Sequence, residues 1–177
     1  MEHACRGLPP DCTARGKAVK ILFALLLWIS AAGAAGAQET RPFVRGSLQA
    51  IVSSHQGKPF ALALWSLDCT HCRDDMVLFR ELAKKYRDFD LVLISTDAPE
   101  QAQEVERTLK HYRLERFESW VFAGSFAERL RYEIDPLWYG ELPRTYFFDA
   151  AGHSISVSGK IERAQIERWV HESKKHG

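Results

Sequence analysis

Apolar and polar positions follow two different periods along the chain, and their order predicts the secondary structure. Residues 58–65 and 90–96 are almost continuously apolar, which is typical of strands buried on both faces of a sheet. Between them, after Cys72, apolar residues recur every three or four positions, as in an amphipathic helix. The residues with this helical spacing are Met76, Leu78, Phe79, Leu82, Ala83 and Tyr86.

The second half of the chain continues this alternation. Asp97 is placed as the N-cap of a helix that runs to about His111, with Glu100 completing a capping box and Pro99 in the first turn. The remaining predicted elements are a short strand at 118–122, a short helix at 126–132, a hairpin with strands at 144–149 and 153–159, and a last helix at 160–176.

This order of elements predicts an α/β fold. Strands separated by helices pair in parallel through right-handed crossovers, whereas the late hairpin adds antiparallel strands. We therefore expect a three-layer sandwich, with a mixed central sheet and helices on both faces. The 177 residues, 46% of them hydrophobic, are enough for one well-packed domain. The net charge of +1 and the absence of a basic stripe argue against a nucleic-acid surface.

The first 37 residues do not fit that domain and resemble a secretory signal peptide. A short apolar run at 21–29 follows basic residues, and small residues then lead to Ala37, after which we expect cleavage. An uncleaved membrane anchor is the alternative. We also consider a translation start at Val19 rather than Met1. The predicted organisation is a removed leader at 1–37, a loose lead-in at 38–46 and a domain at 47–177.

Cleavage would leave Cys69 and Cys72 as the only cysteines. Two thiols three positions apart can be half of a zinc site, a structural cross-link or a working dithiol–disulfide pair. A closed zinc site needs four ligands, which this pair does not supply. In an exported protein a close pair can cycle between its reduced and oxidised forms.

The position of Cys69 favours a reactive pair. It lies between a predicted buried strand and a predicted helix, and the start of a helix stabilises an anion. The pKa of a cysteine in such a place falls to roughly 3.5–7.5, from about 8.5. We expect Cys69 to be the exposed nucleophile and Cys72 to be shielded and to resolve the mixed disulfide.

The cysteines and their surroundings also carry a family resemblance. Residues 57–72, GKPFALALWSLDCTHC, are followed by an amphipathic helix and, far downstream, by ELPRTYFFDAAG at 141–152. Across residues 46–172 this resembles the TlpA-like thiol-disulfide oxidoreductases of the thioredoxin superfamily. The matching positions are Trp65, Cys69, Cys72, Arg73, Asp75, Pro143, Thr145, Phe147, Asp149 and Gly152.

The resemblance implies a thioredoxin-like sandwich with a redox-active Cys69–Cys72 disulfide and no other cofactor or metal. It also implies a cis peptide bond before Pro143, beside the cysteines. Asp75 stands where the family has a glutamate, and it would relay the proton of Cys72. The alternative is a first-turn acid that only interacts favourably with the helix dipole.

Other positions near the pair are candidates for tuning or docking. Asp68 replaces the family's usual aromatic, which puts the redox potential in doubt, and a plain turn or cap role is its alternative. Thr70, His71 and Trp65 complete the redox-tuning set; an imidazolium at position 71 would favour the thiolate. For docking we name Leu142, whose backbone would pair with an extended partner, and Trp138, which would add an apolar rim; ordinary packing is the alternative for Trp138.

These residues predict an exported thiol-disulfide oxidoreductase. The resemblance implies a disulfide reductase of the bacterial periplasm, which acts on disulfide- or thiol-bearing exported proteins and is supplied by a membrane electron donor. Keeping apocytochrome thiols reduced for cytochrome c maturation is one role within that class. The alternatives are a thiol oxidase or isomerase on the same fold, a Cu(I) metallochaperone using Cys69, Cys72 and His71, and a purely structural disulfide.

Overall fold

The structure, a computed structural model, describes residues 39–124 and 126–173; the predicted signal peptide lies outside the described residues. The elements in chain order are β1 (Arg41–Phe43), α2 (Ser47–Ser54), β2 (Phe60–Trp65), α3 (Cys72–Lys85), β3 (Leu91–Ser95), the 3-10 turn η2 (Pro99–Gln101), α4 (Ala102–Tyr112), β4 (Glu118–Phe122), α5 (Ala127–Ile134), β5 (Arg144–Phe148), β6 (Ser154–Ser158) and α6 (Arg163–Ser173). Among the described helices, none is both long and apolar enough to cross a membrane.

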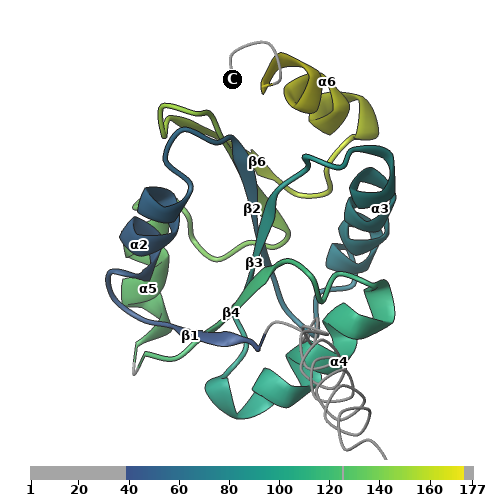
Figure 1. Cartoon of the computed structure of the whole chain (residues 1–177). Coiled ribbons are helices and arrows are strands. Elements are labelled where there is room, and N and C mark those ends of the chain that lie inside the picture. Colours follow the sequence, from purple (N-terminus) through teal and green to yellow (C-terminus); the bar gives the residue numbers. More distant parts are fainter. Residues whose placement is uncertain (1–38, 125, 174–177) are drawn as a thin grey trace, which may run out of the picture. The chain divides into compact units, whose positions relative to one another are not determined.

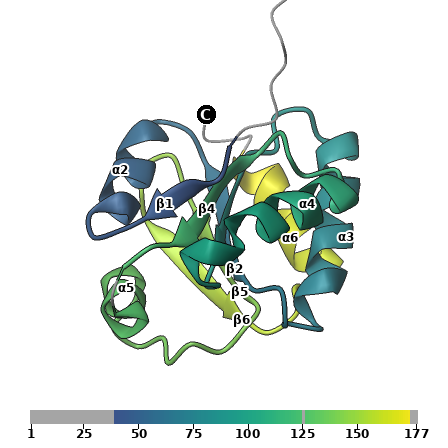
Figure 2. The same ribbon diagram turned by 90° about the horizontal axis from the view of Figure 1, so that it is seen from below.

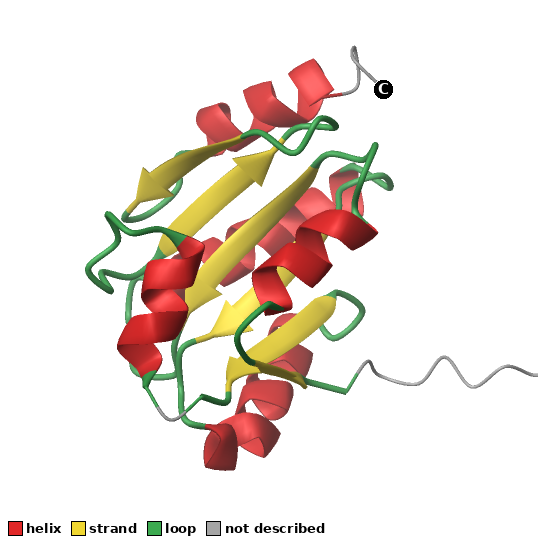
Figure 3. Ribbon diagram, turned by 90° about the vertical axis from the view of Figure 1, so that its left-hand side faces the viewer, coloured by secondary structure: helices red, strands yellow, loops and turns green. Residues whose placement is uncertain are grey.

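Six strands form one mixed sheet in the order β1-β4-β3-β2-β5-β6 (Figure 3). The four strands from β1 to β2 are parallel, and β5 and β6 are antiparallel to their neighbours. The crossovers and the late hairpin predict this mixture because a helix returns the chain to the same end of the sheet, whereas a tight turn reverses it. The predicted α/β sandwich is confirmed.

Helices cover both faces of the sheet, as Figures 1 and 2 show: α2 and α5 lie on one face, and α3, α4 and α6 on the other. Strand β2 is buried on both sides. Its residues Ala61, Ala63 and Trp65 belong to the core beneath α3, α4 and α6, while Phe60, Leu62 and Leu64 belong to the core beneath α2 and α5. A strand that lies between two cores is apolar at nearly every position, because both of its faces are buried.

The predicted loose lead-in at 38–46 is wrong. Residues Arg41–Phe43 form β1, which pairs in parallel with β4, and the buried ring of Phe43 stacks on Phe122 with centroids 5.5 Å apart. The helix α2 that follows was not predicted either. Its fully buried anchor is Ile51, and Gly46 at its start has a φ of 87°. A three-residue strand and a helix with so few apolar anchors give almost no periodic signal.

The predicted capping box at the start of α4 is also wrong. The helix begins at Ala102 after the 3-10 turn, and Ala98 donates its N–H to Oε1 of Gln101, at 3.3 Å. Asp97 instead faces the cysteine loop. Its Oδ2 accepts the N–H of Leu67, at 3.0 Å, and the hydroxyl of Ser95. The carboxylate therefore joins the loop before Cys69 to the end of β3.

Candidate active site

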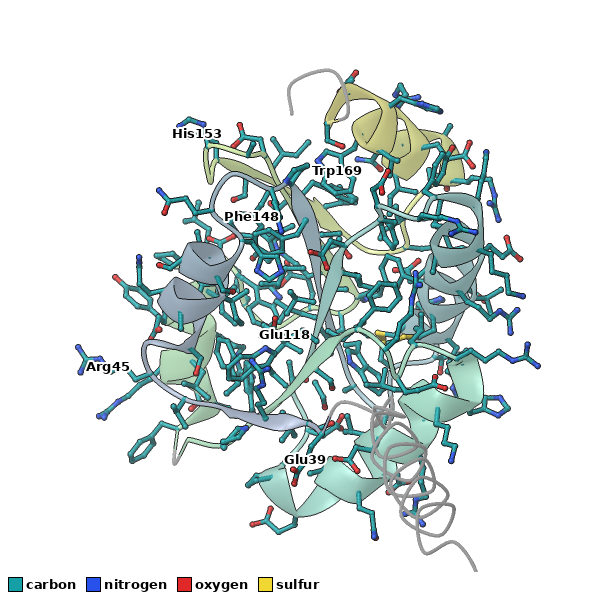
Figure 4. All side chains as sticks on the ribbon, viewed as in Figure 1. Glu39, Arg45, Glu118, Phe148, His153 and Trp169 are labelled. Atoms are coloured by element: carbon teal, nitrogen blue, oxygen red, sulfur yellow. A yellow bond between two sulfur atoms is a disulfide. The ribbon has the colours of Figure 1, made fainter. Side chains whose placement is uncertain are left out.

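Cys69 and Cys72 are joined in a disulfide, with their Cα atoms 5.3 Å apart. The pair follows the end of β2, and Cys72 is the first residue of α3. Figure 4 shows the sulfur–sulfur bond near the start of that helix. The strand–turn–helix junction predicted from the sequence is therefore the place where the two sulfurs meet.

The two cysteines differ in exposure. Cys72 is 2% exposed and lies in the core beneath α3, whereas Cys69 is only partly buried. The backbone N–H of Cys72 donates to Sγ of Cys69, at 3.2 Å. In the reduced protein this N–H and the partial positive charge of the helix start would stabilise a thiolate on Cys69. The geometry favours attack by Cys69 and resolution by Cys72.

Asp75 is buried in α3, one turn after Cys72, and is 2% exposed. Its Oδ1 accepts the N–H of Ile161, at 3.1 Å, whereas Oδ2 is buried and has no partner among the described residues. Burial raises the pKa of this carboxyl to about 6, although the Ile161 N–H and the charge of Lys160 act in the opposite direction. Asp75 can therefore exchange a proton near neutral pH.

The peptide bond between Leu142 and Pro143 is cis, as the resemblance implied. Strand β5 runs antiparallel to β2 with Arg144 opposite Leu64, so the buried Pro143 lies beside the end of β2 from which the cysteine loop leaves. Gly159 donates its N–H to the Pro143 carbonyl, at 2.8 Å, and holds the proline against β6.

Leu142 presents an unpaired backbone next to this proline. Within residues 39–124 and 126–173, its N–H and C=O make no backbone hydrogen bond. Its side chain is half-buried and packs against both cores, including the one that contains Cys72. An extended partner segment could pair with this backbone as an added strand does.

The predicted tuning residues surround the pair unequally. Thr70, His71 and Asp68 are exposed, and His71 makes no side-chain cap on α3. Trp65 is buried, and its Nε1 has no partner among the described residues. A groove of about 540 Å³ runs beside the second cysteine; Trp65, Asp68, Cys72, Arg73, Arg107 and His111 are among the residues that line it.

Trp138 does not form the expected apolar rim, because its side chain is buried. Trp138 is 4% exposed, and its Nε1 donates to the carbonyl of Glu141, at 2.9 Å, so it anchors the loop before the proline. Its neighbours Leu137 and Tyr139 are 76% and 90% exposed. The sequence places an aromatic pair here, but only packing decides which ring points outward.

The described residues contain no group of three His, Cys, Asp or Glu side chains that could hold a metal. The two cysteine sulfurs are bonded to each other in this structure and so do not present thiolates. What the site offers is a disulfide, a buried carboxyl and a cis proline.

No protein-family model matches the chain, and no curated protein matches it. Solved structures do match. A secreted disulfide oxidoreductase of Mycobacterium tuberculosis, homologous to DsbE of E. coli, has a TM-score of 0.53 at 21% identity, over 68% of this chain and 85% of that chain. A thiol:disulfide interchange protein of the thioredoxin family from Chlorobium tepidum has 0.53 at 20% identity, over 71% and 84%.

A DsbF homologue from Corynebacterium diphtheriae is also similar, with a TM-score of 0.55 at 12% identity, over 68% of this chain and 75% of that chain. Identities this low establish the fold and nothing finer. The chain therefore has a thioredoxin-like fold, which confirms the predicted three-layer sandwich.

Proposed function

We propose that this protein is an exported thiol-disulfide oxidoreductase that reduces disulfides in partner proteins through Cys69 and Cys72. The observation that carries the proposal is the asymmetry of the pair. Cys69 is partly buried and its sulfur accepts an N–H at a helix start, whereas Cys72 is buried and lies one helical turn before a carboxyl whose pKa is raised. A purely structural cross-link would not require the buried carboxyl.

The reaction begins with the pair reduced. The Cys69 thiolate attacks one sulfur of a partner disulfide, that disulfide breaks, and its second sulfur leaves as a thiolate and takes up a proton. The Cys72 thiol then loses its proton and attacks Sγ of Cys69. The mixed disulfide breaks, the partner leaves fully reduced, and two electrons have passed from the cysteine pair to the partner.

Asp75 acts on the second step as the base for the Cys72 proton. Both groups are buried on α3 three positions apart, so they lie on one face of the helix. With a pKa of about 6, the carboxyl is mostly ionised at pH 7 and accepts a proton with little penalty. It acts directly or through a water.

The partner binds where Leu142 presents its unpaired N–H and C=O. The exposed side chains of Leu137 and Tyr139, a few positions earlier in the same loop, add an apolar surface for an unfolded or extended segment. This surface is suited to a disulfide-bearing chain without a fixed fold.

The direction and the surroundings of the reaction are the finer part of the proposal. The resemblance supports net reduction, with a dithiol of a membrane donor returning the pair to its reduced form. The leader-like N-terminus and the secreted M. tuberculosis neighbour support export to the periplasm or an equivalent compartment. Apocytochrome thiols are one substrate class in this setting.

Trapping tests the exchange chemistry. In Cys72→Ala, the mixed disulfide on Cys69 cannot be resolved, so we expect covalent adducts with partner proteins on non-reducing gels that disappear with reductant. Cys69→Ala is the matched control and should trap nothing, because the remaining thiol is buried. Equal trapping by both variants, or by neither, would overturn the assignment of roles.

A redox titration against glutathione tests the direction. A disulfide reductase requires a potential well below about −200 mV, whereas a value near −120 mV is that of a strong oxidant. The second outcome would retain the site and reverse the proposed flow of electrons.

A further inference from the structure

The last strand of the sheet, β6, has one edge without a strand partner. It is an end strand that pairs only with β5 among the described strands, and its burial pattern shows exposed residues at every position except Val157. The side chain of Ile155 is 63% exposed. An uncovered edge is a template for another strand.

The backbone of β6 directs alternate residues outward. Asp149 donates its N–H to the His153 carbonyl and Gly159 donates to Pro143, so these pairs are of the hydrogen-bonded type. Antiparallel pairs alternate in type along the ladder. The backbone N–H and C=O groups of Ile155 and Val157 therefore form hydrogen bonds with β5. The N–H and C=O groups of Ser154, Ser156 and Ser158 point away from the sheet.

Proteins normally protect such an edge with charges, prolines or bulges, and the five residues of β6 show none of these. Its sequence, SISVS, contains no charge, proline or glycine, and its register with β5 has no bulge. The guanidinium of Arg144, on β5, donates to the side-chain hydroxyl of Ser156, at 3.0 Å, and to that of Ser158. Isolated edges of this kind are expected to associate.

The sequence of β6 is self-complementary. In an antiparallel pair of two copies centred on Ser156, each Ser154 lies opposite Ser158 and each Ile155 opposite Val157. The outward-directed residues face one another, so all three of their N–H and C=O pairs find partners. The first flanking charges, His153 and Lys160, lie opposite glycines, so no like charges meet.

We propose that two copies of this chain associate through β6, antiparallel about Ser156, so that their sheets become one continuous sheet. The interface is isologous, as in a two-fold dimer. Pro143 bonds to Gly159, just past one end of the strand. Because the strands run in opposite directions, the two redox sites lie at opposite ends of the interface and both stay accessible.

Cysteine pairing tests the register. With the four native cysteines replaced by Ala in the full chain, Ser156→Cys places two Cα atoms about 5.5 Å apart, within disulfide range. Ser154→Cys is the matched control, because its two copies are about 14 Å apart at 3.4 Å per residue. We expect mild oxidation to give a covalent homodimer of the first variant only, and a mixture of Ser154→Cys with Ser158→Cys to give the heterodimer.

Sedimentation velocity tests association without a cross-link, on protein purified from cells that express the full sequence. Ser156→Pro removes an outward N–H and the hydroxyl that accepts from Arg144, but no backbone hydrogen bond to β5, so we expect it to be a monomer, whereas Ser156→Thr keeps the N–H, the hydroxyl and the dimer. A wild-type monomer at all concentrations, equal cross-linking by Ser154→Cys and Ser156→Cys, or capture only of a different protein would each overturn the proposal. Redox activity is independent of all three results.

Discussion

Two aspartates on opposite faces of the sheet have pKa values shifted in opposite directions. Within the described residues Asp75 on α3 forms no ion pair; the nearby Lys160 pairs with Asp74 at 3.0 Å, and burial raises the pKa of Asp75 to about 6. Asp135, after α5, accepts from Arg144 at 2.7 Å, and the Leu137 N–H is the main cause that holds its pKa below the ordinary value.

The difference separates a reactive group from an anchoring one. A carboxylate that is given a guanidinium and several donors stays ionised and holds its neighbours in place. Asp135 in this way fixes Arg144, the residue directly after the cis proline. A carboxylate that is buried with one N–H is poised to gain and lose a proton. Asp135 is of the first kind and lies on the segment before the cis proline, whereas Asp75 is of the second kind and lies one helical turn after Cys72.

Removing the cation should show the anchoring role most strongly. Arg144→Leu leaves Asp135 largely buried without its charge partner, and we expect the free energy of unfolding to fall by about 3 kcal/mol. Chemical denaturation measures this loss. We expect the folded fraction to retain thiol-disulfide exchange through Cys69 and Cys72. Activity lost at unchanged stability would mean that Arg144 belongs to the reactive site and not to the anchor.

Removing the proton acceptor should show the reactive role. In Asp75→Asn, the Cys72 proton has no buried base, and we expect turnover of a protein disulfide to fall roughly a hundredfold at pH 7. The first step, attack by Cys69 in a single-turnover assay, should be little affected. Asp74→Asn is the matched control on the same turn of α3. A similar loss in both variants would contradict a specific role of Asp75.

The same variant should raise stability at neutral pH. Because the folded-state pKa of Asp75 lies above its ordinary value of 3.8, the folded state binds more protons between about pH 4 and 6, and stability is lost as pH rises through this window. We expect Asp75→Asn to be more stable than wild type by about 2 kcal/mol above pH 6 and equal to it near pH 4. A pH-independent difference would point to altered packing instead.

A single ion pair at the surface should give the smallest effect. Lys85 contacts Glu167 at 2.9 Å, joining α3 to α6, and this hydrogen bond raises the lysine's pKa. At the surface, the gain is offset by lost side-chain freedom and screening by salt. We expect Lys85→Ala to leave the Tm unchanged at physiological salt. A clear decrease in calorimetry would mean that surface pairing on this face carries weight comparable to Arg144 on the other.

Local sequence patterns were enough to predict the long, strongly periodic elements and the position of the cysteine pair. Continuous apolar runs gave β2 and β3, helical spacing gave α3, and the cysteines at their junction identified the site. These signals are local, since each depends on residues a few positions apart. The sequence could not predict β1 or the role of Asp97, because their partners, β4 and Leu67, lie at least 30 positions away along the chain.

The raised pKa of Asp75, the burial of Trp138 and the exposure of Tyr139 follow from the folded structure and not from local patterns. A pKa depends on how much water and which charges surround a carboxyl, and those neighbours come from residues 160–161, on a different segment of the chain. Which ring of an adjacent pair points inward depends on the core that it meets. Periodicity along the chain carries no information about such long-range neighbours. The sequence could therefore locate the cysteine pair, whereas the pKa of the carboxyl near it depends on the fold.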